Sequence, residues 1–192
     1  AYYDAVKAFA DNSTTPKGDT ILNAKGLPAL RPSNIDDLPA GNVFFALYKE
    51  ELRKGNEADA NRYCTAANLI RNKLKYEHSR IADGLPGAGG FFHKASYDNQ
   101  MWLDGLYMGS TIYAAWQHAF GGVDSVDNVN SWTDIALQFK TINHYTYDAD
   151  KQLNYHAWSA TPEDENSFWA RTEEPHKGCS PEFWARGMGW YF

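Results

Sequence analysis

The sequence has few cysteines, no long apolar run and no cluster of basic residues, and each absence argues against one class of protein. Its two cysteines, Cys64 and Cys179, are too few for a disulfide framework and lack the spacing of metal ligands. No apolar run approaches the roughly 20 residues of a membrane-spanning helix. A net charge of −6 without a basic run argues against general nucleic-acid binding. We expect neither membrane nor nucleic acid as a partner, while the compartment, cytoplasmic or periplasmic, stays open.

The sequence also lacks a phosphate-binding loop, a metal-ligand cluster and a serine or cysteine triad pattern, so we expect no cofactor and no metal. Aromatic residues, by contrast, are abundant: they make up 15% of the 192 residues and include seven tryptophans. Most such rings belong to a hydrophobic core, because aromatic side chains dominate buried area. The surplus suits the flat apolar faces of sugars, which makes a carbohydrate ligand our first hypothesis.

Apolar residues recur with helical spacing along most of the chain, in two alternating kinds of segment. Residues 36–53 and 99–119 carry them around the whole helix circumference, which is typical of buried helices. Gly121-Gly122 is expected to end the second of these helices. Residues 58–78 and 127–147 carry them on one face, as outer helices do. A further buried helix is predicted to begin at Ser180-Pro181-Glu182, with serine as the cap, proline in the first turn and glutamate complementing the dipole.

The alternation of inner and outer helices indicates helical hairpins arranged around a ring, so we predict an all-α fold. In the segment 127–147, Val129 and Trp132 are expected on the buried stripe and Gln138 off it. Two long loops, 79–98 and 148–180, each lead into an inner helix, and loops of this length usually carry function. We expect them to wall a pocket at the centre of the ring.

Asp104 is the strongest candidate for chemistry, because apolar residues flank it in Met101-Trp102-Leu103-Asp104-Gly105-Leu106. Burial favours the protonated form of a carboxyl group, which equips it to donate a proton. His93 precedes it across a loop that can return the imidazole to the same pocket. Both residues also have a structural interpretation, since a buried aspartate can bond a loop amide and a lone histidine among aromatics is often structural.

Two further groups of residues are candidates for the site. Arg186 and Trp190 are four residues apart and share a helix face, with Trp184 at the helix entrance. A guanidinium beside an aromatic ring is a natural partner for a sugar carboxylate, although it can also pair with an acid of the protein. In Asn34-Ile35-Asp36-Asp37-Leu38, placement on the inner helix favours Asp37 as the functional acid, while Asp36 suits a helix N-terminus equally well.

Three blocks of this sequence closely resemble the unsaturated rhamnogalacturonyl hydrolases, glycoside hydrolase family 105. The related family 88, the unsaturated glucuronyl hydrolases, shares their fold and chemistry. The resemblance implies an (α/α)6 toroid of six hairpins, of which residues 1–192 would form a partial catalytic domain with about half of the ring. We expect the chain to need the remainder of the ring. The three blocks are Gly90-Phe91-Phe92-His93-Lys94, Gln100-Met101-Trp102-Leu103-Asp104-Gly105-Leu106-Tyr107-Met108-Gly109 and Phe183-Trp184-Ala185-Arg186-Gly187-Met188-Gly189-Trp190-Tyr191.

The resemblance also implies a reaction, the removal of a terminal 4,5-unsaturated uronic acid from lyase-generated oligosaccharides such as the rhamnogalacturonan fragments of pectin. Asp104 would protonate the double bond at C4 and then activate water for attack at C5. Two alternatives remain: an inverting (α/α)6 glycosidase using Asp104 and Asp37 as its carboxylates, and a catalytically inactive carbohydrate-binding relative. The residues implied to bind substrate are His93, Trp102, His156, Trp184, Arg186, Trp190 and Asp37.

Overall fold

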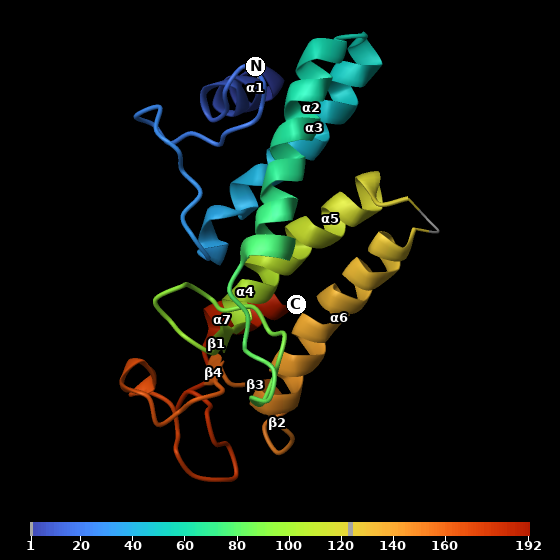
Figure 1. Cartoon of the computed structure of the whole chain (residues 1–192). Helices are drawn as coiled ribbons and strands as arrows, with labels where there is room; N and C mark the ends of the chain where they lie inside the picture. Colours follow the sequence, from blue (N-terminus) through green and yellow to red (C-terminus); the bar gives the residue numbers. More distant parts are fainter. Residues whose placement is uncertain (1, 123–124) are drawn as a thin grey trace.

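The computed structural model describes residues 2–122 and 125–192, which form paired helices and a loop-rich end (Figure 1). The α-helices are α1 (Tyr2–Asn12), α2 (Asn42–Lys54), α3 (Glu57–Asn72), α4 (Leu103–Gly105), α5 (Thr111–Phe120), α6 (Val126–Thr146) and α7 (Ala185–Tyr191). The shorter helices are the 3-10 turns η1 (Ile35–Asp37), η2 (Pro39–Gly41) and η5 (Glu165–Ser167) and the π turns η3 (Lys73–Glu77) and η4 (Leu106–Ser110). The strands are β1 (Gln100–Trp102), β2 (Tyr147–Asp148), β3 (Leu153–Asn154) and β4 (Ala157–Ser159).

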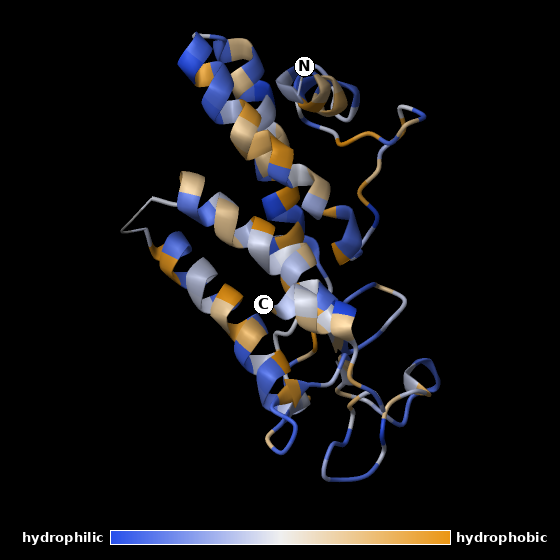
Figure 2. Ribbon diagram, turned by 180° about the vertical axis from the view of Figure 1, so that it is seen from behind, coloured by the Kyte–Doolittle hydropathy of each residue, from blue (hydrophilic) through white to orange (hydrophobic). Residues whose placement is uncertain are grey.

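Helices α2 and α3 form one hairpin and α5 and α6 the next, as Figure 1 shows. The first hairpin turns at Gly55, whose left-handed φ of 78° lets its N–H bond the last carbonyls of α2. Helical segments mix apolar and polar residues along their length, whereas polar residues predominate in the loops (Figure 2). The predicted all-α hairpin fold is therefore confirmed. None of the described helices combines the length and apolarity that a bilayer crossing requires.

The inner helix runs without a break from Leu103 to Phe120 through α4, η4 and α5, and Gly121 ends it as predicted. Its predicted start at residue 99 is wrong. Residues Gln100–Trp102 instead form β1, which pairs with β4 in antiparallel register, so that Trp102 lies opposite Ala157. The backbone there bonds across a two-stranded sheet and leaves the helix to begin beside Asp104.

Helix α2 also starts later than predicted, because the segment before Asn42 forms the 3-10 turns η1 and η2. It is not buried on all sides in the described residues: Phe44 and Leu47 are in the core, whereas Leu52 is 48% exposed. The apolar residues around the circumference of this helix thus predicted that it is more buried than it is in this part of the ring.

The buried face of α6 differs from the predicted stripe. Val129 and Trp132 are 57% and 41% exposed, whereas Gln138 is 1% exposed. Gln138 accepts a hydrogen bond from the N–H of Phe91 (2.8 Å) and donates one to the carbonyl of Gly89 (3.2 Å). A polar side chain is buried here because it satisfies the backbone of the loop 79–98, which hydropathy does not reveal.

Helix α7 begins at Ala185, so its predicted start at Ser180-Pro181-Glu182 is wrong. Ser180 does not cap a helix; its backbone N–H donates to the carbonyl of Ala157 (2.9 Å), and its hydroxyl accepts from the N–H of Ala157 (3.3 Å). The residues before α7 are therefore held against β4. This pairing brings the start of α7 to the start of α4.

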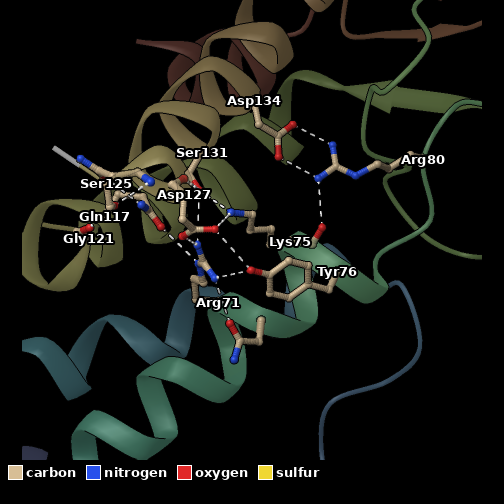
Figure 3. Close-up of polar contacts among 12 residues, drawn as sticks. Arg71, Lys75, Tyr76, Arg80, Gln117, Gly121, Ser125, Asp127, Ser131 and Asp134 are labelled. Carbon is tan, nitrogen blue, oxygen red and sulfur yellow. Dashed lines mark hydrogen bonds and ion pairs between the residues drawn. The ribbon is translucent and has the colours of Figure 1, made fainter. Parts of the chain in front are cut away.

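A buried arginine joins the two hairpins. Arg71, at the end of α3 and 4% exposed, donates to Gln117 of α5 (3.1 Å) and pairs with Asp127 of α6 (2.5 Å) (Figure 3). Lys75 pairs with the same aspartate, and its ammonium also bonds Ser131 (2.8 Å). A charge at this depth needs several partners, and this network provides them from both hairpins.

Candidate active site

Asp104 is the second residue of α4, directly after β1, and is 6% exposed. The β1–β4 pairing continues one step into the helix, because the N–H of Leu103 donates to the carbonyl of His156 (3.0 Å). This bond brings two chain segments more than fifty residues apart together at the first turn of the inner helix. The sheet thereby places a carboxylate and an imidazole side by side.

The two oxygens of Asp104 have different surroundings. Oδ1 accepts a hydrogen bond from Nε of Arg186 at 2.9 Å, across the contact between α4 and α7. Oδ2 is buried, has no hydrogen-bond partner among the described residues, and lies 3.7 Å from Nε2 of His156. The guanidinium of Arg186 stands over the ring of Trp184 at 4.1 Å. One oxygen is held by Arg186, and the other lies beside the imidazole of His156.

His93 is 4% exposed and stacks on Trp102, with ring centroids 4.6 Å apart and planes within 3°. Tyr97 stacks on Trp102 as well, at 5.2 Å. Burial lowers the pKa of His93 to about 4, against the opposing effect of the Asp36 carboxylate. The Nδ1 atom of this histidine is buried and without a partner in the described part of the chain.

His156 contacts two indole rings edge-on, Trp102 at 5.1 Å and Trp184 at 4.8 Å. Burial lowers the pKa of His156, and the nearby Asp104 carboxylate opposes that shift. His156 and His93 are thus both neutral at pH 7. A neutral imidazole has one donor and one acceptor nitrogen, which suits recognition of a hydroxyl group.

The preference for Asp37 over Asp36 is not supported by the geometry. Asp37 pairs with Arg31, whose Nη2 lies 2.5 Å from Oδ1, and accepts from the backbone N–H of the same arginine. Asp36 instead lies with Oδ1 3.5 Å from Nε2 of His93 and with Oδ2 2.9 Å from the ammonium of Lys94. Both acids lie in the 3-10 turn η1, where three residues complete a turn and neighbouring side chains diverge.

Trp190 lies at the margin of this cluster. It packs on Tyr107, with centroids 4.3 Å apart, one turn beyond Asp104 on the inner helix. Among the described ring contacts and hydrogen bonds, none joins it to Asp104, His93 or His156. Its predicted place in the binding site therefore depends only on the helix face that it shares with Arg186.

The structure brings in residues that sequence reasoning did not single out, namely Lys94, Tyr97 and Trp169. A cavity of about 290 Å³ beside the site is lined by Trp102, Trp169, Trp184 and His156, among others. The loop 148–180 is rich in polar and turn residues, which indicated a functional role. The sequence of the loop could not indicate which of its aromatic rings faces the cavity. Within the described ranges, no group of three or more histidine, cysteine, aspartate or glutamate residues is arranged to hold a metal ion.

The described residues thus combine helical hairpins with a buried acid at the start of an inner helix, two imidazoles of lowered pKa and several indole rings. The model of glycosyl hydrolase family 88 matches residues 1–192, and the chain belongs to this family. The structure is similar to that of a glycoside hydrolase from family 105 of C. acetobutylicum ATCC 824, with a TM-score of 0.76 and 33% sequence identity. The match covers 99% of this chain and 44% of that chain, so these residues span less than half of the relative's length. The family resemblance and the half-ring fold are thereby confirmed.

Proposed function

We propose that residues 1–192 form part of the catalytic domain of a hydrolase that removes a terminal 4,5-unsaturated uronic acid from lyase-generated oligosaccharides, such as rhamnogalacturonan fragments. Membership of family 88 and similarity to a family 105 glycoside hydrolase support the class of reaction. The proposed substrate and the proposed roles of Asp104, His93, His156 and Arg186 rest on the arrangement of these side chains.

The observation that carries the proposal is a set of three buried polar atoms without hydrogen-bond partners in the described residues: Oδ2 of Asp104, Nδ1 of His93 and Nε2 of His156. Buried polar atoms in proteins are almost always hydrogen-bonded, and exceptions call for an explanation. All three belong to the cluster around Trp102. A bound polyhydroxylated substrate, with donors and acceptors, would satisfy them.

In the proposed reaction, Asp104 transfers its proton to C4 of the double bond, and the ring oxygen stabilises the positive charge that develops at C5. The resulting carboxylate then takes a proton from water as the water oxygen bonds to C5. The product is a hemiketal, which opens to a ketone. The released C1 hemiacetal expels the remaining sugar and becomes an aldehyde. One acid that acts twice suffices, because the net first step is the addition of water.

The neighbours of Asp104 have matching roles in this proposal. Arg186 holds Oδ1 in place, which leaves Oδ2 to face the double bond. Its guanidinium, with 46% of the side chain exposed, can also receive the uronate carboxylate. Trp102 offers a flat apolar wall for the half-planar unsaturated ring, and neutral His93 and His156 can bond its hydroxyls.

Replacement of the acid tests the proposal. In the full-length protein, we expect Asp104→Asn to slow the loss of the double bond's ultraviolet absorbance at least about a hundredfold, because amide cannot transfer the proton. Lyase-generated rhamnogalacturonan and glycosaminoglycan disaccharides serve as substrates. Asp83→Asn is the matched control, since Asp83 is exposed in the loop 79–98. Wild-type activity in Asp104→Asn would refute the mechanism.

The same assay separates the alternatives. An inverting glycosidase with two carboxylates would cleave saturated oligosaccharides and form no keto product. An inactive relative would bind the unsaturated disaccharides without changing their absorbance. Either result would overturn the hydration mechanism, while the second would retain a carbohydrate as the partner.

A further inference from the structure

A stack of two rings in the hydrophobic core joins the segments that bring His156 and Trp184 to Asp104. Tyr155, directly before His156, is 5% exposed and stacks on Phe183, directly before Trp184. The ring centroids of this stack are 4.3 Å apart and the planes are inclined by 15°. The residues that follow, His156 and Trp184, meet edge-on at 4.8 Å. The two segments therefore contact each other twice, once in the core and once within the site.

Tyr155 is held by the end of α6 and by the turn between β2 and β3. Its backbone N–H donates to the carbonyl of Thr146, the last residue of α6 (2.9 Å). Its hydroxyl donates to Oδ2 of Asp148 (3.1 Å). The other oxygen of this carboxylate accepts the backbone N–H groups of Asp150 and Lys151, each at 3.0 Å. Both the backbone and the hydroxyl of the tyrosine are thereby fixed.

The segment before α7 makes further contacts with the same ring. The guanidinium of Arg171 stands over Tyr155 at 4.7 Å, and it donates to the carbonyl of Pro181, two residues before Phe183 (2.9 Å). The imidazole of His176 also packs on Tyr155, with ring centroids 4.8 Å apart. Contacts from residues 171–183 thus converge on Tyr155.

The residues that follow the two stacked rings set the surroundings of both oxygens of Asp104. His156 lies 3.7 Å from Oδ2, and Trp184 lies under the guanidinium of Arg186, whose Nε donates to Oδ1. A shift of one segment against the other would move the imidazole relative to the guanidinium and tilt the carboxyl group between them. A displacement of about 1 Å at a reacting group can slow an enzymatic reaction about a hundredfold.

We propose that Tyr155 is a positioning residue for Asp104, through its stack on Phe183. The stack sets how far His156 lies from Arg186 and so orients the carboxyl group between them. The inference rests on the proposed function for its reaction, whereas the stack itself is independent of the substrate.

The test replaces the stacked rings in the full-length protein and measures kcat and KM for an unsaturated uronate disaccharide. Tyr155→Leu stays apolar but cannot stack. We expect it to lower kcat at least about tenfold with little change in KM, because the acid is displaced while the surface of Trp102 remains. Phe183→Leu removes the same stack from its partner and should cause the same loss. Tyr155→Phe keeps the stack and should retain most of kcat.

The matched control is Phe44→Leu, which breaks a buried ring stack on Tyr63 in the first hairpin and should leave kcat unchanged. Circular dichroism at the assay temperature verifies that each variant is folded. A loss of kcat in Phe44→Leu equal to that in the two stack variants would overturn the positioning role, since it would indicate general destabilisation.

A second measurement does not need turnover. Burial is the main cause of the lowered pKa of His156, while the charges of Asp104 and Arg186 act on it in opposite directions. Looser packing admits water and should raise this pKa toward its ordinary value of 6.5. We expect an upward shift of the His156 titration, followed by NMR on histidine-labelled protein, in Tyr155→Leu and Phe183→Leu but not in Tyr155→Phe.

The two measurements separate this inference from the proposed function. A wild-type enzyme that does not turn over the unsaturated disaccharide, together with a shifted His156 titration in Tyr155→Leu, would count against the proposed reaction alone. An unchanged titration in the two leucine variants would overturn the positioning role. An unchanged kcat in these variants of an active enzyme would overturn it as well.

Discussion

Trp102 is the residue around which the site is assembled. Its ring system stacks with those of His93 and Tyr97, and the imidazole of His156 approaches it edge-on. The indole N–H is bonded to the buried Gln100, so the ring has a single orientation. Such a ring keeps water away from both imidazoles, which explains why burial dominates their pKa shifts.

The buried histidines predict acid sensitivity. Because burial lowers the pKa of His93 from 6.5 to about 4, the unfolded chain binds a proton at this residue between those pH values and the folded chain does not. The native state is therefore destabilised as pH falls from 6.5 toward 4. We expect the melting temperature to decline over this range, and to decline less in His93→Gln.

The control for this titration is His118→Gln, at an exposed position of α5. A decline that is equally steep in wild type and His93→Gln would show that the imidazole of His93 is not kept neutral by the fold.

At the scale of elements, the π turn η4 and the 3-10 turn η1 depend on close packing at Gly109. A methyl group at this position would lie 2.5 Å from Cδ1 and 2.8 Å from Cγ1 of Ile35, which is 2% exposed. Ile35 precedes Asp36, and its N–H donates to the carbonyl of His93 (3.2 Å). The glycine therefore allows η1 to approach the inner helix and brings Asp36 to the imidazole.

We expect Gly109→Ala to lower the free energy of unfolding by about 1–3 kcal/mol, because it overpacks this contact. The measurement is chemical denaturation in a double-mutant cycle with Ile35→Val, which removes the Cδ1 atom. The double variant should recover part of the loss. Strictly additive effects would indicate that the two residues do not share the contact.

The ion-pair network of Arg71 connects the hairpins, and within it the Arg71 side chain is 5% exposed whereas that of Asp127 is 48% exposed. Arg71→Leu leaves Gln117 and Asp127 without their shared donor, and we expect a loss of roughly 3 kcal/mol in the free energy of unfolding. Denaturant titration measures it. The comparison is Arg53→Leu, which breaks a solvent-exposed pair with Glu50 and should change stability little. Equal losses in both variants would contradict a special role for the network of Arg71.

For the whole molecule, helix α6 carries an exposed apolar surface. Val126, Val129 and Trp132 are 76%, 57% and 41% exposed, and Leu137 lines the same surface. Large exposed apolar patches promote association. We therefore expect the 192 residues, produced alone, to self-associate in size-exclusion chromatography and to bind a hydrophobic dye. A monomer that melts cooperatively would refute this expectation.

The sequence predicted the hairpins, because helical periodicity is a local pattern. It also named Asp104, His156 and Arg186 as site candidates, and these side chains lie next to one another in the structure. The segments 58–78 and 127–147 correspond to α3 with η3 and to α6, and the end of the inner helix at Gly121 is confirmed. The predicted helix starts near Gln100 and at Ser180 are wrong. The residues there are compatible with a helix by their sequence pattern, but they pair with β4 instead. Partners distant in sequence decided these boundaries.

The amino-acid sequence by itself determined the alternation of helices and the apolar setting of Asp104, because periodicity and immediate neighbours are properties of consecutive residues. The tertiary structure decided that Asp36 rather than Asp37 faces His93, that Gln138 is buried, and that Trp169 lines a cavity. Each of these depends on which backbone group, ring or charge arrives from a distant segment. Hydrogen bonds and stacking act over a few ångströms in space, whatever the distance along the chain.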